Sequence, residues 1–183
     1  MDQMDTVEAA GRLPLHGVRC AMRADGSMWT MGNWRSIPVL LRAAMDADLA
    51  VSSMLVWDKD WIGPAGPQGL RSQHEICLVM PGGAAWKQPD RSQGDVLRIR
   101  ASSSKPSGHP AEKPPALMAR LLELAAPPTE GAILDPFAGS GVTGVIAKAA
   151  GRRCILIEAE ERWCEVSAKR LSQDVIDLSG WST

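Results

Sequence analysis

The sequence predicts an α/β fold with a mainly parallel sheet. Short apolar runs alternate with segments of helical spacing along the 183 residues, and the last third reads as a β-α-β-α unit around a glycine-rich turn. The composition, 45% hydrophobic and 22% charged, is ordinary for a globular core. Because one domain typically has about 100–200 residues, we expect residues 1–183 to form a single domain.

The first half of the chain contains the signals of four strands and one helix. In residues 34–47 the apolar residues recur at helical spacing, and Pro38 is compatible only with the first turn of such a helix. The runs on either side have the length and composition of strands, and a Gly/Pro-rich loop at 62–69 separates two of them. The predicted strands are Ser27–Met31, Val51–Trp57, Glu75–Met80 and Val96–Ile99.

The second half is more regular. A helix over Pro115–Ala125 is followed by a strand at Ala132–Leu134, a glycine-rich turn and a helix to about Ala150. A strand at Cys154–Ile157 and a helix at about Arg162–Leu171 complete the unit. Because two strands alone do not make a stable sheet, we expect Ser27–Met31, Val51–Trp57 and Glu75–Met80 to join them.

Several classes of protein are excluded by simple counts. No stretch approaches the ~18 apolar residues that a membrane span needs. The acidic start, Met1–Asp5, lacks the basic region of a signal peptide, so we expect a cytoplasmic protein without a membrane partner. The four cysteines lack metal-ligand spacing, which predicts free thiols and no metal site.

Charge is unevenly distributed along the chain. The net charge of −1 argues against a uniformly basic nucleic-acid binder, but the segment Lys87–Arg120 carries +4 and the remainder −5. Cations in this segment are candidates for contacts with DNA phosphates, and a solvated loop explains them equally well. These candidates are Arg91, Arg98, Arg100 and Lys105.

The glycine-rich turn is the most informative motif. Gly139, Gly141 and Gly144 match the pattern G-x-G-x-x-G after a predicted strand, and Glu158 ends the next strand, 19 residues after Gly139. A carboxylate at that position can accept hydrogen bonds from ribose hydroxyls. The pattern therefore predicts a nucleoside site, although glycines also serve tight strand-to-helix turns.

Asp135 distinguishes between a dinucleotide and a nucleoside without phosphate. It ends the strand immediately before the glycines, where a carboxylate repels the diphosphate of a dinucleotide. S-adenosylmethionine carries no phosphate and brings an ammonium and a sulfonium, both of which an acid favours. The predicted cofactor is therefore S-adenosylmethionine, and an NAD-linked oxidoreductase is the more distant alternative.

Several motifs together resemble the amino-DNA methyltransferases of phages and bacteria, which methylate adenine N6 or cytosine N4. Asp135-Pro-Phe-Ala-Gly-Ser-Gly141 is similar to the cofactor motif of that family, and His109-Pro-Ala-Glu-Lys-Pro114 to the motif that precedes it in permuted, β-type members. The likeness continues through Leu156–Glu158 and Glu161–Glu165. Upstream it includes Asp25–Ser27, Trp34–Arg35, Leu55–Lys59 and Gln73–Ile76, so that it spans roughly residues 17–171.

The resemblance implies a circularly permuted, Rossmann-like sheet of an S-adenosylmethionine-dependent methyltransferase. Residues 17–80 would supply strands of the catalytic half, 81–108 a loop or target-recognition segment, and 109–171 the cofactor-binding half. The implied reaction is site-specific DNA methylation, in which the amine of a base flipped from double-stranded DNA attacks the sulfonium methyl group. Members of this kind also occur in restriction-modification systems.

Nine residues are predicted to bind the cofactor, each with a structural alternative. Phe137 fits the core equally well, Ser140 and Thr143 fit helix capping, and His109 and Lys113 fit a solvated loop. The predicted set is Asp135, Phe137, Gly139, Ser140, Gly141, Thr143, Glu158, His109 and Lys113.

One motif of the family is missing. The acceptor site of its members is a polar residue followed by Pro-Pro-aromatic at the end of a strand, whereas the two Pro-Pro pairs here read Lys113-Pro-Pro-Ala116 and Ala126-Pro-Pro-Thr129, and the chain has no Tyr. The catalytic residues are therefore unknown, and we expect a sheet that lacks one central strand. Three explanations are open: a truncated or wrongly started gene product, a subunit that needs a second chain, or a degenerate paralogue. The alternative function is thus a non-catalytic cofactor- or DNA-binding subunit.

Overall fold

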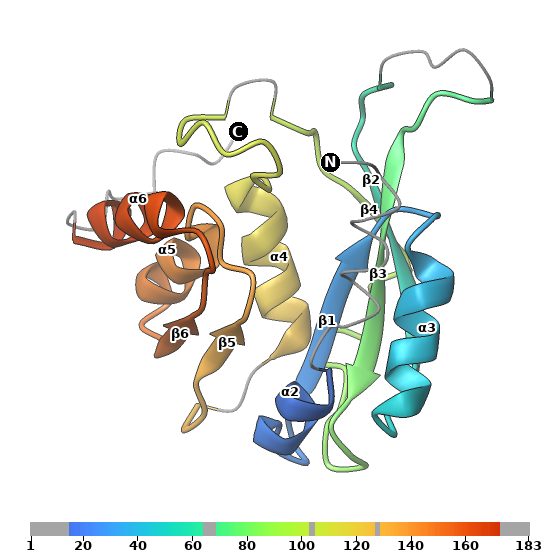
Figure 1. Cartoon of the computed structure of the whole chain (residues 1–183). Helices are drawn as coiled ribbons and strands as arrows, with labels where there is room; N and C mark the ends of the chain where they lie inside the picture. Colours follow the sequence, from blue (N-terminus) through green and yellow to red (C-terminus); the bar gives the residue numbers. More distant parts are fainter. Residues whose placement is uncertain (1–14, 64–68, 103–104, 127–128, 173–183) are drawn as a thin grey trace. The chain divides into compact units, whose positions relative to one another are not determined.

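The computed structural model describes residues 15–63, 69–102, 105–126 and 129–172 (Figure 1). These residues belong to two compact units. The first runs up to Ala101 and includes Glu123–Ala126, and the second contains Ser102–Leu122 and the residues from Pro127 onward. No helix in the described ranges has the length and hydrophobicity required to span a membrane. The expectation of one domain over residues 1–183 stays a prediction.

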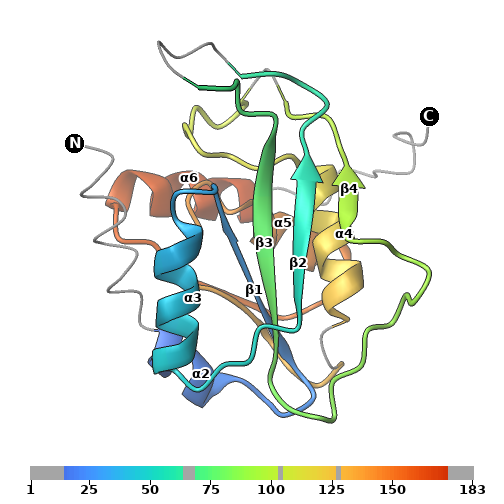
Figure 2. The same cartoon turned by 90° about the vertical axis from the view of Figure 1, so that its right-hand side faces the viewer.

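The first unit contains a four-stranded sheet in the order β1-β3-β2-β4 (Figure 2). The four predicted strands are confirmed, with ends that differ by at most two residues, and the predicted helix begins at Ile37, with Pro38 in its first turn. The short helix α2 was not predicted. The elements are α2 (Leu15–Ala21), β1 (Ser27–Gly32), α3 (Ile37–Asp46), β2 (Ser53–Asp58), β3 (His74–Pro81) and β4 (Val96–Arg98).

The prediction of a mainly parallel sheet is wrong for this unit. β3 lies between β1 and β2 and is antiparallel to both, and only β2 and β4 pair in parallel. The middle of β3, Cys77 to Met80, is buried on both faces of the sheet, which explains why an uninterrupted apolar run takes a central position. β1, β2 and β4 run in the same direction, and β3 runs opposite to them.

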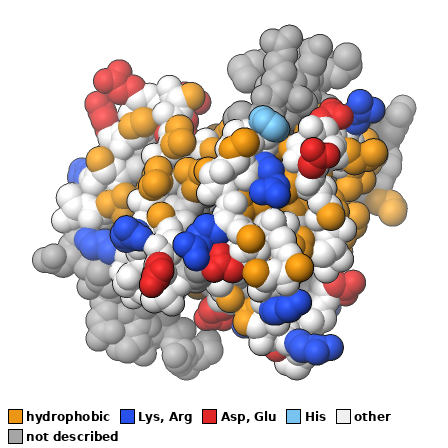
Figure 3. Space-filling model, turned by 90° about the horizontal axis from the view of Figure 1, so that it is seen from below, with side chains coloured by type: hydrophobic (Ala, Val, Ile, Leu, Met, Phe, Trp, Pro, Cys, Tyr) orange, Lys and Arg blue, Asp and Glu red, His pale blue; other side chains and the backbone are white. Residues whose placement is uncertain are grey.

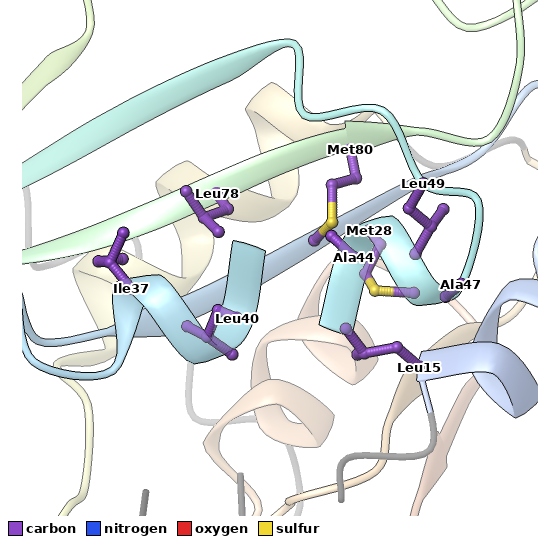
Figure 4. Packing of buried hydrophobic residues seen from close by; sticks show 9 residues of the cluster. All are labelled: Leu15, Met28, Ile37, Leu40, Ala44, Ala47, Leu49, Leu78 and Met80. Atoms are coloured by element: carbon purple, nitrogen blue, oxygen red, sulfur yellow. The ribbon is translucent and has the colours of Figure 1, made fainter. Parts of the chain in front are cut away.

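One face of this sheet is covered by α3 (Figure 4). Ile37, Leu40 and Ala44 on α3 are spaced by three and four residues and therefore lie on one face of the helix. They form a cluster with Met28 on β1 and with residues of β3, and Leu15 of α2 belongs to the same cluster. The β3 residues of this cluster are Leu78 and Met80, which alternate with the residues of the opposite face.

The second unit contains the predicted β-α-β-α arrangement. β5 (Ile133–Asp135) and β6 (Cys154–Leu156) pair in parallel, and α5 (Val142–Ala149) connects them. α6 (Glu161–Ser172) follows β6, and α4 (Pro115–Ala125) precedes β5, with its first eight residues in this unit and its last three in the first. These elements match the predicted helices and strands within about two residues.

The expected continuous sheet is not formed by the described residues. β5 and β6 make a separate two-stranded sheet, and no hydrogen-bonded pair in the described ranges joins them to the strands of the first unit. The expectation of one sheet is therefore wrong for this part of the chain. The expected lack of a central strand stays a prediction.

Candidate cofactor site

The turn between β5 and α5 has the conformation that its glycines predict. Gly139 and Gly141 have φ of 50° and 75°, in the left-handed region that favours glycine. Each also lies against a side chain of the same unit. A Cβ on Gly139 would lie 3.0 Å from His109 Nε2, and one on Gly141 would lie 2.8 Å from Ser167 Oγ. Both positions therefore disfavour a side chain by conformation, and at Gly141 the contact with Ser167 is also too close for a Cβ.

The third glycine of the motif acts differently. Gly144 lies in the first turns of α5, and a Cβ at this position would lie 2.7 Å from Leu156 Cδ1 of β6 and 3.2 Å from Leu171 Cδ2 of α6. Its role is the close approach of α5 to its neighbours, which is the function of the third glycine in nucleoside-binding turns.

Asp135 shapes the turn with its own carboxylate. Its Oδ1 accepts the N–H of Phe137 at 3.0 Å, and its Oδ2 accepts the hydroxyl of Thr143 at 2.5 Å. Thr143 is buried, so this hydroxyl serves the turn. The N-cap of α5 is Gly141, without a side-chain cap, and the helix-capping alternative for Thr143 is therefore wrong.

Glu158 holds the opposite side of the turn. Its Oε2 accepts the N–H of Gly139 at 2.7 Å, and its Oε1 accepts the N–H groups of Ala159 and Glu160 at 2.8 and 3.0 Å. The hydrogen bond from the N–H of Glu160 contributes most to a lowered pKa of Glu158, and those from the N–H groups of Gly139 and Ala159 add to it. Together they outweigh the partial desolvation of the carboxylate, which raises the pKa. The carboxylate is therefore ionised at neutral pH and keeps acceptor capacity for a further donor.

His109 packs against the turn. Its ring lies edge-on to Trp163 of α6, with 4.5 Å between the ring centroids, and its Nδ1 accepts the N–H of Ala111 at 3.2 Å. The ring also lies against Gly139, so His109 packs between α6 and the glycine turn, and its predicted role in cofactor binding stays a prediction. Lys113 is half-buried.

Phe137 and Ser140 differ in their exposure to solvent. The Phe137 side chain is 62% exposed, so the core alternative for this residue is wrong. Ser140 is buried, and its carbonyl and hydroxyl oxygens accept hydrogen bonds from Arg170 Nη1 at 3.0 and 3.1 Å. Its hydroxyl therefore binds within the protein, and Gly141 again excludes the capping alternative.

Three residues that hold the turn were not predicted from the sequence: Ser167 and Arg170 on α6, and Glu112 in the loop before α4. Ser167 donates to the carbonyl of Gly139 at 2.9 Å, and Arg170 pairs with the carboxylate of Glu112 at 2.9 Å. Burial raises the pKa of Glu112, but the hydrogen bonds from Ser107 and the charge of Arg170 outweigh it and lower the pKa overall. Glu112 lies within the motif quoted above, and its position there was the available signal.

The four predicted DNA-contact residues are all exposed. Arg98 donates to Asp58 Oδ2 at 3.0 Å, and the Lys105 ammonium donates to the carbonyl of Pro110. Arg91 and Arg100 belong to the first unit with Arg98, whereas Lys105 belongs to the second. On the face drawn in Figure 3, basic side chains are interspersed with acidic and apolar ones, in keeping with the net charge of −1.

The Pro-Pro pair at Lys113–Ala116 has a structural role. Pro114 is buried, and Pro115 is the first residue of α4, where its fixed φ suits the start of a helix. The prolines of the second pair, 127 and 128, lie outside the described residues.

We expect Gly141→Ala to destabilise the protein more than Gly151→Ala. Gly151 also has a positive φ, of 65°, but a Cβ there meets nothing within 4 Å. The strained backbone should cost each variant about 1–2 kcal/mol. Overpacking against Ser167 should cost Gly141→Ala about 1–3 kcal/mol more. Urea unfolding measures both, and equal losses would contradict the packing seen at Gly141.

We expect Glu158→Gln to reduce stability at neutral pH and to lose that effect in acid. Because the folded pKa is lowered, the carboxylate stabilises the native state fully above the ordinary glutamate value of about 4.3. That contribution disappears as the pH falls through the lowered pKa. Urea unfolding from pH 7 to pH 3 measures the difference from wild type, with Glu165→Gln as an exposed control on α6. A difference that stays constant with pH would refute this account.

Comparisons with known proteins agree with the motifs. The family model for DNA methylases that modify N6 or N4 matches residues 14–169. The chain is 43% identical over 176 residues to the type II methyltransferase M2.LlaDCHI of Lactococcus lactis, covering 85% of this chain and 63% of that protein. It is 32% identical over 151 residues to YubD of Escherichia coli K12, covering 82% and 64%. The chain thus spans less than two thirds of the length of these relatives.

Solved structures share the fold. A crystal structure of an M1.HpyAVI–SAM complex superimposes with a TM-score of 0.75 at 23% identity, covering 94% of this chain and 84% of that one. The PvuII cytosine-N4-specific DNA methyltransferase gives a TM-score of 0.70 at 18% identity, covering 89% and 70%. The match of the family model over most of the residues, with the glycine turn and its two carboxylates inside it, shows that this chain belongs to the DNA methylase family.

Proposed function

We propose that this chain is part of an S-adenosylmethionine-dependent methyltransferase that acts on adenine N6 or cytosine N4 in double-stranded DNA in the cytoplasm. The observation that carries the proposal is the placement of two carboxylates, Asp135 and Glu158, at the carboxyl ends of two paired parallel strands, with the glycine turn between them. Ligands of open α/β sheets bind outside the carboxyl ends of the strands. Membership of the DNA methylase family supports the same assignment.

The hydrogen bonds of the turn favour a ligand that brings donors and positive charge. The N–H groups of Phe137 and Gly139 donate to Asp135 and Glu158, and those of Ala138 and Gly141 donate to backbone carbonyls. A diphosphate needs such N–H groups free and repels both carboxylates. The ammonium and ribose hydroxyls of S-adenosylmethionine are donors, so the residues present fit this cofactor.

Each residue of the turn has a distinct task in this proposal. Glu158 keeps one carboxylate position for a ribose hydroxyl, and the negative charge of Asp135 favours the cationic end of the cofactor. The exposed ring of Phe137 offers an apolar surface for the nucleoside. Ser140, Thr143 and His109 keep the turn in shape through the contacts described above. When bound, S-adenosylmethionine supplies a methyl group on a positively charged sulfur.

The basic residues of the segment 87–120 would contact DNA phosphates. Arg91, Arg100 and Lys105 are exposed, and the Arg98 side chain is 74% exposed despite its pairing with Asp58. Such contacts position a protein on DNA without reading its sequence, and they weaken as salt increases.

A second candidate is a binding subunit that requires a partner chain. One observation favours it: neither Pro-Pro pair of the chain is followed by an aromatic residue, and the pair at Lys113–Ala116 begins a helix. In this version the partner supplies the strand with the polar residue and the aromatic that orient the target base.

We expect S-adenosylmethionine to bind the folded chain and NADH not to bind. Asp135→Asn should weaken binding of S-adenosylmethionine by about 10- to 100-fold, because the amide preserves the hydrogen bond from Phe137 but removes the charge. Isothermal titration calorimetry measures all three affinities. The absence of binding, or an unchanged affinity of Asp135→Asn, would count against the proposed cofactor site.

We expect the isolated chain to bind S-adenosylmethionine without methylating DNA. Mass spectrometry of unmethylated DNA after incubation detects N6-methyladenine and N4-methylcytosine separately, and the Asp135→Asn variant is the control for contaminating activity. Methylation by the wild-type chain alone, lost in that variant, would refute the subunit hypothesis and identify the target base.

A further inference from the structure

One face of α6 is directed at the glycine turn. Trp163, Ser167 and Arg170 are separated by four and three residues and therefore line the same face of the helix. Trp163 and Ser167 are buried, and the Arg170 side chain is 24% exposed. Arg170 thus places a charge in a partly buried position, which is costly unless the charge is paired and hydrogen-bonded.

Each residue of the row contacts the turn or the loop before α4. Ser167 donates to the carbonyl of Gly139, and Arg170 donates to both oxygens of Ser140. Trp163 contacts the ring of His109, which in turn lies against Gly139. Consecutive carbonyl groups of the glycine turn are thus held from one helix.

Arg170 extends these contacts to the loop before α4. Its Nη1 lies 2.9 Å from Glu112 Oε1, and the Glu112 side chain is only 5% exposed. The other oxygen of Glu112 accepts the hydroxyl of Ser107 at 2.6 Å, and that hydroxyl accepts the N–H of His109 at 3.1 Å. A continuous chain of hydrogen bonds therefore joins the His109 loop, α6 and the glycine turn.

We propose that Arg170, paired with Glu112, is a positioning residue that holds the glycine turn ready for S-adenosylmethionine. This inference rests on the proposed function, from which it takes S-adenosylmethionine as the ligand. Arg170 does not need to touch the cofactor in this role. A turn that is already ordered loses less conformational freedom on binding, and the cofactor then binds more tightly.

The contacts of Arg170 require a hydrogen-bond donor at the end of the side chain at position 170. The three acceptors, two on Ser140 and one on Glu112, are all within reach of the single nitrogen Nη1. A lysine ammonium has three donors and can satisfy the same groups, whereas a methionine of similar length has no donor. Lys169, the exposed neighbour on α6, offers a matched control for the loss of one positive charge.

We expect Arg170→Met in the full chain to lower the affinities for S-adenosylmethionine and for S-adenosylhomocysteine by the same factor, about 10- to 100-fold. The factor is the same because the substitution acts through the turn and not at the methyl group. Arg170→Lys and Lys169→Met should stay within about threefold of wild type, and Glu112→Gln should fall between these limits. Calorimetry with both nucleosides measures the affinities.

Amide hydrogen exchange tests the same inference without any ligand. In Arg170→Met the amides of Gly139 and Gly141 should exchange at least about tenfold faster, while that of Ile133 in β5 keeps its wild-type rate. If Arg170→Met does not fold, Glu112→Gln provides both measurements.

The outcomes distinguish a failure of the proposed cofactor from a failure of the proposed role of Arg170. A wild-type chain that binds neither nucleoside would refute the proposed cofactor, and the exchange rates would still test the role of Arg170. A folded Arg170→Met with wild-type affinity and wild-type exchange at Gly139 and Gly141 would overturn the inference. An equal loss of affinity in Lys169→Met would also overturn it, because the effect would then belong to net charge.

Discussion

The hydrogen bond from the N–H of Gly139 to the carboxylate of Glu158 is the interaction on which the site depends. It fixes the glycine turn to the end of β6, at a point where the chain has two left-handed residues close together. Buried backbone groups must find partners, and the neighbouring groups do. Ala138 donates to the carbonyl of Ile157, and Ile157 donates to that of Asp135, so the contact between the turn and β6 continues the parallel β5–β6 ladder.

The same carboxylates serve the fold and the proposed chemistry. Asp135 accepts hydrogen bonds from Phe137 and Thr143, which is a sufficient reason for an acid at the end of β5. Its negative charge nevertheless remains, and burial together with this charge raises the pKa of the neighbouring Cys154 thiol to about 11. A residue whose structural role uses its lone pairs and leaves its charge intact can therefore take part in both tasks.

Local patterns predicted the second unit well, because its elements follow one another along the chain. The helix Pro115–Ala125 was predicted with its observed ends, and the glycine turn with its flanking carboxylates was legible because glycine spacing reports backbone conformation directly. The order of strands in the first unit was not predictable in the same way. β3 inserts between β1 and β2 in the opposite direction, and nothing in the spacing of its apolar residues specifies which strands lie beside it.

The residues that hold the turn were missed for a related reason. Glu112 and Arg170 are 58 residues apart, and each alone resembles a solvated charge in a loop or at the end of a helix. Only the fold brings them together, where one is almost fully buried and must be paired. The same holds for Ser167, whose hydroxyl has no sequence signal that would link it to a carbonyl 28 residues earlier.

The ambiguity of the glycine motif is resolved by its hydrogen bonds. The spacing of Gly139, Gly141 and Gly144 suits a dinucleotide as well as a nucleoside, because in both cases the glycines serve the turn and the approach of the helix. The two kinds of site differ in the acceptors that the backbone N–H groups of the turn bind. Here the carboxylates of Asp135 and Glu158 take the N–H groups of Phe137 and Gly139, which a phosphate would otherwise use. The negative charge and the engaged donors thus have the same origin, and both favour a cationic nucleoside.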